Sequence, residues 1–296
     1  MALELPASSL TFPDHRAGSA HEPDGGAERL GGRGLTARTA LWRVLQTSVR
    51  GTAHVRDELP CQDSGFAVVT RPAEEDFLVV ACADGAGSAE LSQEGSRIAC
   101  TDLVQLVCAE LQAGLRVEQI DRTLVTKWYA TIHANLGAAA EERQVPRRQL
   151  ACTLLMAIAG ESTAVFAQVG DGAIVVRDGE RYDVIFWPQS GEYLNLTNFV
   201  TDETFSTALQ ISTLGRVEEI AVMTDGLQML ALNFAMRTPH HQFFEPMFEP
   251  LRRTLTPDDL VVPLRGFLGS PQVVDKTDDD LTLILATRWA SAPATS

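Results

Sequence analysis

The sequence lacks the features that mark disulfide-rich, membrane-spanning and nucleic-acid-binding proteins. Its five cysteines are odd in number and form no Cys-x-x-Cys pair, which excludes a complete disulfide framework and indicates reduced thiols. No apolar run approaches the roughly 20 residues of a membrane-spanning helix, and the first residues lack the basic-then-apolar order of a secretion signal. Basic residues are few, 24 against 39 acidic ones, and the net charge of −15 repels polyanions. We therefore expect a cytoplasmic protein without a nucleic-acid or membrane partner.

The composition favours one large folded domain with a tail at each end. Hydrophobic residues make up 45% of the 296-residue chain, which is enough for a sizeable core. Residues 1–38 are rich in Gly, Ala, Pro and Ser and show no sustained hydrophobic period, so we expect a flexible N-terminal tail. The domain is expected over residues 39–290, followed by a short C-terminal tail, residues 291–296. No internal repeat or interior linker is evident.

Short apolar runs predict strands, and two longer periodic segments predict helices. The strands are expected at residues 41–50, 65–70, 77–83, 152–159, 164–169, 174–177, 182–187, 220–224 and 281–286. A first helix is indicated by Val104, Val107, Cys108 and Leu111, with Ser88 or Ser92 as its cap and Gly114 at its end. A second is indicated by Ile120, Leu124, Trp128, Ile132 and Leu136, ending at Gly137 before Pro146. With a further helical stretch over residues 227–268, the order predicts a layered α+β domain.

Three aspartates stand at the ends of strand-like runs. Asp84 follows the run 77–83, Asp225 follows 220–224, and Asp279 precedes 281–286. Buried strands cannot carry carboxylates through their middles, so acidic residues collect where strands emerge, and a shared sheet can bring these ends together. Carboxylates held close repel one another unless a cation neutralises them, and an all-oxygen set suits Mg²⁺ or Mn²⁺. The pattern indicates a metal site.

An Asp-Gly pair alone is weak evidence for such a site, because turns favour that pair. Asp178-Gly179, for example, is most simply the turn of a hairpin between two short strands. Asp84 and Asp225 differ because each ends an apolar run and is followed by a glycine that lets the backbone approach a ligand closely. Their joint placement is therefore the informative signal.

Five acidic motifs follow one another along the chain in a specific order. They are Gln62-Asp63, Asp84-Gly85, Gly170-Asp171-Gly172, Thr224-Asp225-Gly226 and Asp278-Asp279-Asp280-Leu281-Thr282. Over residues 41–288 the sequence thereby resembles the metal-dependent type 2C protein Ser/Thr phosphatases. Residues 60–63 and 191–199 resemble the bacterial branch, whose members are often encoded beside kinases or von Willebrand A-type proteins. The resemblance implies a four-layer α/β-β/α sandwich, in which helices flank two antiparallel sheets.

The resemblance also implies a role for each acidic residue. Asp84 would bridge two Mg²⁺ or Mn²⁺ ions, with the Gly85 carbonyl as a further ligand. Asp225 and Asp279 would complete the shell of the first ion, and Asp63 would bind through metal-held water. Two ions about 3.5–4 Å apart would lower the pKa of a shared water that attacks phosphoserine or phosphothreonine. Asp171 matches the acid beside an accessory third ion.

Some positions depart from the pattern of the family. Gln62 replaces a glutamate, so its neutral carbonyl oxygen would contact the second ion and bind it more weakly. Met229 replaces an acid of the third ion, which makes a stable third ion doubtful. Glu58 replaces an arginine that grips phosphate, and Arg50 and Arg56 are the alternatives for this task.

A general acid is also missing from its usual place, because Ala86 stands where some relatives carry a histidine. His54 is the nearest histidine by sequence that could protonate the leaving oxygen, although water can also serve. Thr153 matches a family threonine but reads as a structural strand residue. The pair His240-His241, with Glu245 beyond it, is better explained by a helix surface than by zinc, because a spaced partner is lacking.

The leading hypothesis is a signalling phosphatase whose partner is a phosphorylated protein, either a cognate Ser/Thr kinase or its target. Gln62, Glu58 and Met229 keep open an alternative: a weakly active or inactive relative that binds phosphoproteins as a regulatory module. A third hypothesis, a Mg²⁺-dependent phosphodiesterase or nuclease, is disfavoured by the acidic balance and the absence of a basic stripe.

Overall fold

The computed structural model describes residues 42–72, 75–187 and 197–289. The predicted tails, residues 1–38 and 291–296, lie outside the described residues, as do residues 191–196 of the motif at 191–199.

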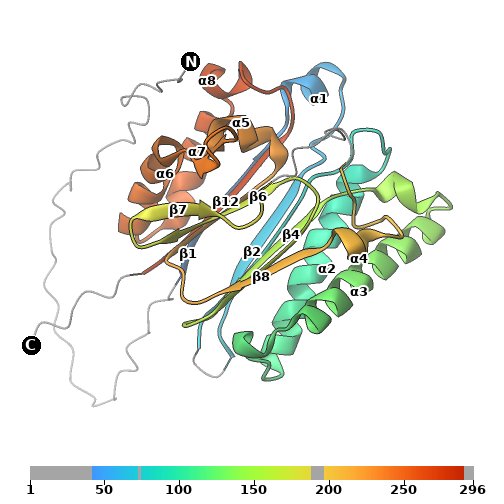
Figure 1. The fold of residues 1–296 in the computed structure, drawn as a ribbon. Coiled ribbons are helices and arrows are strands. Elements are labelled where there is room, and N and C mark those ends of the chain that lie inside the picture. The colour runs from blue at the N-terminus through green and yellow to red at the C-terminus, as the bar shows by residue number, and fades with distance from the viewer. Residues whose placement is uncertain (1–41, 73–74, 188–196, 290–296) are drawn as a thin grey trace, which may run out of the picture.

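Two five-stranded sheets form the centre of the molecule, and every strand pairing in them is antiparallel (Figure 1). The first sheet has the order β1 (Trp42–Val49), β12 (Leu281–Arg288), β9 (Glu219–Met223), β6 (Ala173–Asp178) and β7 (Arg181–Val184). The second has the order β2 (Ser64–Thr70), β3 (Phe77–Ala83), β4 (Leu154–Ala159), β5 (Ala164–Val169) and β8 (Gln210–Leu214). The short strands β10 (Leu232–Asn233) and β11 (Thr238–Pro239) pair separately.

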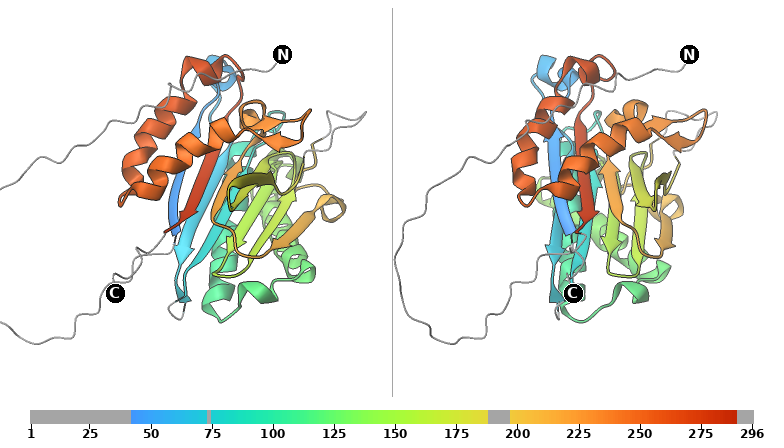
Figure 2. Two further views of the ribbon diagram at one scale, coloured as in Figure 1. Left: turned by 60° about the vertical axis from the view of Figure 1, so that its left-hand side comes forward. Right: turned by 90° about the vertical axis from the view of Figure 1, so that its left-hand side faces the viewer.

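Helices cover the outer face of each sheet (Figure 2). The long helices α2 (Ser92–Gln112) and α3 (Arg122–Glu142) lie against the second sheet, and α6 (His241–Arg253) and α7 (Val261–Leu268) lie against the first. The shorter helices are α1 (Thr52–Arg56), α4 (Phe205–Ala208), α5 (Gln228–Ala231) and α8 (Pro271–Val274), with 3-10 turns η2 (Val117–Gln119), η3 (Arg147–Leu150), η4 (Asp225–Leu227) and η5 (Pro257–Leu260). Among the described residues, no helix has the length and apolarity needed to cross a bilayer.

This arrangement confirms the expected four-layer α/β-β/α sandwich. Strand β3 shows why the sequences of the central strands are unbroken apolar runs. Val79 and Ala81 pack with the residues of α2 and α3, whereas Leu78 and Val80 pack between the two sheets. Because successive side chains of a strand point to opposite faces, a strand buried on both faces has no place for polar residues. Carboxylates are therefore confined to the strand ends.

Several predicted boundaries were wrong. The second long helix begins at Arg122, after Asp121 caps its N-terminus by accepting a hydrogen bond from the Leu124 amide at 2.8 Å. It also continues through Gly137 to Glu142, and the Arg147 side chain packs over that glycine. Strand β8 was missed, because its sequence has little apolar character and it lies at a sheet edge. In the predicted helical stretch 227–268, the β10–β11 pair separates α5 from α6.

A buried ionic cluster ties α6 to the first sheet. Glu219 of β9 is fully buried, and Arg252 of α6 donates a hydrogen bond to its Oε2 atom at 3.0 Å. Arg177 of β6 lies 2.9 Å from the same oxygen, and the Tyr182 hydroxyl donates to it at 3.0 Å. Because an ionised side chain is costly to bury alone, these partners compensate the carboxylate and hold α6 in place.

Two helical glycines provide a matched test of close packing. A Cβ atom added at Gly95 of α2 would overlap the carbonyl oxygen of Leu150, whereas one added at Gly266 of α7 would meet open space. We expect Gly95→Ala to lower the free energy of unfolding by about 1–3 kcal/mol through overpacking. Gly266→Ala should instead raise it by about 0.5–1 kcal/mol, because alanine favours the helix.

Chemical denaturation monitored by circular dichroism measures both changes. Equal free energies of unfolding for Gly95→Ala and the unsubstituted protein would contradict the close approach of α2 and η3.

Candidate metal centre

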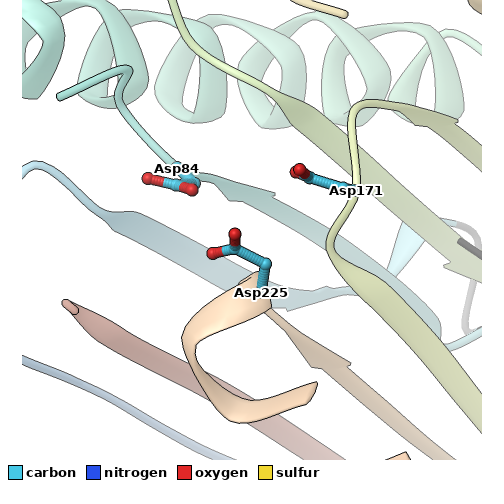
Figure 3. Close-up of side chains that lie close together, drawn as sticks. All are labelled: Asp84, Asp171 and Asp225. Carbon is cyan, nitrogen blue, oxygen red and sulfur yellow. The ribbon is translucent and has the colours of Figure 1, made fainter. Parts of the chain in front are cut away.

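Three aspartates that are distant in sequence meet at one end of the sandwich. Asp84 directly follows β3, Asp171 lies in the turn between β5 and β6, and Asp225 opens the turn η4 after β9. One carboxylate oxygen of each lies within 4.8 Å of the corresponding oxygens of the other two. Figure 3 shows the three side chains directed toward a common space, each from a different strand end. Of the three aspartates expected to gather from the sequence, this group contains Asp84 and Asp225, whereas Asp171 takes the third place and Asp279 is not part of it.

Glycines flanking Asp171 allow its turn to lie close to the neighbouring strands. Gly170 has a φ of 114°, a left-handed conformation that favours glycine, and a Cβ atom there would overlap the side chain of Thr153. A Cβ atom on Gly172 would lie 2.7 Å from the carbonyl oxygen of Met223. Both glycines are thus needed for the backbone to bring Asp171 toward the ends of β4 and β9.

Two threonines hold the acidic residues by backbone and side-chain hydrogen bonds. The Asp84 amide donates to the Thr153 hydroxyl at 2.8 Å, which agrees with the structural interpretation of that threonine. The Thr224 hydroxyl donates to Asp63 Oδ2 at 2.8 Å and itself accepts from the Thr282 amide at 3.0 Å. Thr224 therefore links Asp63, on the segment before β2, to the strand ends that carry Asp225.

Burial and mutual repulsion make ionisation of these carboxyl groups unfavourable. Burial raises the pKa of Asp84 well above its usual range, and the nearby carboxylates of Asp63 and Asp225 add to the shift. Burial also raises the pKa of Asp225 to about 6, and repulsion from Asp171 and Asp279 adds to it. The pKa of Asp63 is raised by its burial, as is that of Asp279. A positive charge placed among these groups would reverse these shifts.

Buried oxygen atoms without hydrogen-bond partners provide places for such a charge. They are the Oδ1 atoms of Asp63, Asp171 and Asp225 and the Oε1 atom of Gln62. The second oxygen of Asp171 accepts a hydrogen bond from the Thr197 hydroxyl at 2.6 Å, so the carboxylate is held with one oxygen to spare. An unpaired buried oxygen is costly, whereas carboxylate and amide oxygens are the ligands that Mg²⁺ and Mn²⁺ prefer. The residues present fit a divalent cation.

The basic residues considered for phosphate binding make other contacts. Arg50 donates to the Leu59 carbonyl at 3.1 Å, and Arg56 pairs with the neighbouring Asp57 at 2.9 Å. Glu58 has a left-handed φ of 57°. In this structure neither arginine contacts the acidic residues of the centre through a hydrogen bond, so their role toward phosphate stays a prediction.

The two histidine hypotheses have different outcomes. His54, on α1, lies with Nδ1 2.9 Å from Asp280 Oδ2, which places it beside the Asp278-Asp279-Asp280 run but does not test its role as an acid. His240 is the N-cap of α6 and His241 its first residue, whose ring packs edge-on against Tyr182 with centroids 5.5 Å apart. This packing supports the helix-surface interpretation of that pair.

Sequence reasoning missed one residue of the centre, Asp280. Its neighbour Asp279 was identified from the same run, but Asp280 is the more buried of the two, with 2% of its surface exposed. Asp280 directly precedes the apolar run of β12, and this position could have identified it from the sequence as a residue of the centre. Met229, which stands where relatives carry an acid, is 72% exposed on α5 and offers no carboxylate to the centre.

Comparisons with known proteins identify the family. The profile of the family "Protein phosphatase 2C" matches residues 50–268. Serine/threonine-protein phosphatase 3 of Escherichia coli (strain K12) is 36% identical over 253 residues, which cover 84% of this chain and 99% of that protein.

Solved structures of bacterial phosphatases share the fold at low sequence identity. Serine/threonine phosphatase Stp1 from Staphylococcus aureus superposes with a TM-score of 0.54 at 16% identity, covering 87% of this chain and 99% of that one. The catalytic domain of the serine threonine protein phosphatase PstP, in complex with 2 manganese ions, superposes with a TM-score of 0.55 at 14% identity, covering 84% and 99%. The extent of the family match and the identity to the E. coli protein together show that this chain is a hydrolase of the protein phosphatase 2C family.

Proposed function

We propose that the protein hydrolyses phosphoserine and phosphothreonine in a partner protein by means of a metal-activated water. The observation that carries the proposal is the meeting of Asp84, Asp171 and Asp225 within 4.8 Å, with buried carboxylate oxygens left unpaired. Such a set is unfavourable without a cation and becomes favourable with one. Membership of the protein phosphatase 2C family supports phosphomonoester chemistry at this place.

The proposed ions are either Mg²⁺ or Mn²⁺. Asp84, the Gly85 carbonyl, Asp225 and Asp279 would hold the first ion. Asp84, Asp63 and Gln62 would serve the second ion, and Asp171 would serve an accessory third. When bound, such ions lower the pKa of a water molecule and neutralise charge on phosphoryl oxygens.

The protein's own contribution is to hold and orient these groups. Thr153 fixes the backbone that carries Asp84, and Thr224 fixes one carboxylate oxygen of Asp63, so less reorganisation is needed when substrate arrives. His54 is the proposed acid: contact through Nδ1 with Asp280 leaves Nε2 as the nitrogen that can donate a proton to the leaving serine or threonine oxygen.

The substrate is proposed to be a protein of a phosphorylation pathway, a Ser/Thr kinase or the target of that kinase. All five cysteines are free, which supports a reducing, cytoplasmic location. A regulatory module that binds phosphoproteins without turnover is the second candidate. It is favoured by Gln62, Glu58 and the exposed Met229, each of which replaces a charged residue of active relatives.

Activity assays separate the two candidates. We expect hydrolysis of p-nitrophenyl phosphate and of a phosphothreonine peptide with Mn²⁺ or Mg²⁺, and none after chelation. Asp84→Ala and Asp225→Ala should each lower kcat/KM by at least about 100-fold, because removing even a supporting residue of a metal site costs about 10–100-fold. Asp178→Ala, in the hairpin turn between β6 and β7, is the control and should retain full activity. Peptide binding without turnover in the unsubstituted protein would favour the regulatory module.

Metal binding should depend on pH in a defined direction. Because the folded-state pKa of Asp84 and that of Asp225 are raised, the metal-free protein holds protons that the unfolded chain releases, and it loses stability as the pH rises through these values. Mn²⁺ replaces the protons, so the increase in Tm caused by Mn²⁺ should grow between pH 5.5 and 7.5.

At a Mn²⁺ concentration of about 100 times Kd the stabilisation reaches about 2.7 kcal/mol. Differential scanning calorimetry with Mn²⁺ and with EDTA at each pH measures the difference. A difference in Tm that falls with increasing pH would contradict the assignment of these aspartates as ligands.

His54 can be tested with leaving groups of different basicity. A serine or threonine alkoxide needs a proton, whereas nitrophenolate leaves readily without one. His54→Gln should therefore lower kcat for a phosphothreonine peptide by about 100-fold or more and kcat for p-nitrophenyl phosphate by only a few-fold. Stopped-flow or steady-state rates with both substrates give the ratio; equal losses would rule out a role as general acid and leave His54 a structural residue.

A further inference from the structure

Asp280 is a buried carboxylate with three partners from distant parts of the chain. Its Oδ1 atom accepts a hydrogen bond from the Gly51 amide at 2.7 Å. Its Oδ2 atom accepts one from the Gln62 amide at 2.5 Å and lies 2.9 Å from Nδ1 of His54. With 2% of its surface exposed, Asp280 depends on these partners, because a buried charge is tolerated only when it is well hydrogen-bonded.

The three partners belong to the segments that border the metal centre. Gly51 is the residue from which α1 begins, and α1 carries His54. A Cβ atom at Gly51 would overlap the backbone of Asp278 and Asp279, so this turn lies directly on the run that carries the ligand Asp279. The Ala53 amide also donates to the Asp278 carbonyl at 2.9 Å. The position of α1 is therefore set by the residues that directly precede β12.

The Gln62 backbone is held from its other side by α2. The Ser96 hydroxyl donates to the Gln62 carbonyl at 2.6 Å, and Ser96 is fully buried. A Cβ atom on Gly85 would lie 2.7 Å from the same carbonyl oxygen, so the segment is in close contact with the backbone that follows Asp84. With its amide and carbonyl both fixed, Gln62 is left with its side-chain carboxamide, whose Oε1 atom is buried and unpaired.

The fixed backbone compensates for a weak ligand. A neutral amide oxygen attracts a divalent ion less than a carboxylate does. The binding free energy that Gln62 can contribute is therefore small, and it would be lost if the residue first had to be ordered. Residues that orient ligands without touching the metal typically change metal affinity by about 10–100-fold. Asp280 and Ser96 act in this way, because they orient the peptide groups of Gln62 and thereby the adjacent Asp63.

We propose that Asp280 is a positioning residue that, together with Ser96, holds Gln62 and Asp63 toward the second metal ion and sets His54 beside them. The proposal rests on the metal-dependent function proposed above. It assigns no ligand role to Asp280. It explains instead why a carboxylate next to the ligand Asp279 is directed at two backbone amides and an imidazole.

Metal binding to the full-length protein tests the proposal directly. Asp280→Asn keeps the shape of the side chain, but the Gly51 and Gln62 amides donate to different oxygens of Asp280, and in asparagine one of these positions becomes an NH₂ group that opposes its donor. Titration of the metal-stripped protein with MnCl₂ in a calorimeter should show a Kd about 10–100-fold weaker for at least one ion. Ser96→Ala should change the Kd in the same direction, by a smaller factor.

Glu219→Gln is the matched control, because it alters an equally buried carboxylate with several partners in the ionic cluster under α6. Both Asp280→Asn and Glu219→Gln should lower the Tm in EDTA, but only Asp280→Asn should weaken Mn²⁺ binding. Unchanged Mn²⁺ affinity in folded Asp280→Asn would overturn the proposal. If that variant fails to fold, Ser96→Ala decides, and unchanged affinity in it has the same consequence. An unsubstituted protein that binds no Mn²⁺ would instead refute the metal-dependent function itself.

A double-mutant cycle tests the link to His54. If Asp280 sets the imidazole, His54→Gln should lower kcat for the phosphothreonine peptide much less in the Asp280→Asn background than in the unsubstituted protein. Additive losses would show that Asp280 does not position His54.

Discussion

Repulsion among carboxylates is the interaction on which the proposed metal site depends. The two buried sheets bring these carboxylates to the same end of the molecule. Asp84, Asp171 and Asp225 come from three strand ends and lie within 4.8 Å of one another. Burial and mutual repulsion raise the pKa of Asp84 and that of Asp225, so the arrangement stores an unfavourable free energy that a cation releases. The fold maintains this arrangement because the strands behind it are anchored in a core that is apolar on both faces.

Around the centre, some polar groups hold the aspartates in place by hydrogen bonds, and other oxygens stay free to bind a metal ion. Thr153 and Thr224 bond to the backbone of Asp84 and to one oxygen of Asp63, while other oxygens of the centre stay unpaired. Asp280 is a further example, because this carboxylate accepts hydrogen bonds from two backbone amides and lies 2.9 Å from Nδ1 of His54. Such support would allow the centre to use a neutral ligand, the proposed Gln62, where relatives use a charged one.

Departures from the family pattern concentrate among the residues proposed for the second and third ions. Asp84, Asp225 and Asp279, which are proposed for the first ion, are all present, whereas Gln62 stands in place of a carboxylate and Met229 is exposed and apolar. This distribution supports the proposal of an enzyme that holds two ions and lacks a strong third site. Asp171 nevertheless lies in the tight group with Asp84 and Asp225, so the accessory side still has one acidic residue fixed by Thr197.

The sequence alone determined the layered α+β class, most of the strands and the strand-end aspartates Asp84 and Asp225, because apolar period and strand-end carboxylates are local signals. The resemblance to type 2C phosphatases supplied the order of the layers. Only the tertiary structure decided the course of α3 through Gly137, the edge strand β8 and the partners of Asp280, which are up to 229 residues away. These features depend on packing and on hydrogen bonds between distant segments. The sequence cannot distinguish an aspartate whose oxygens face a metal from one whose oxygens accept hydrogen bonds from two backbone amides.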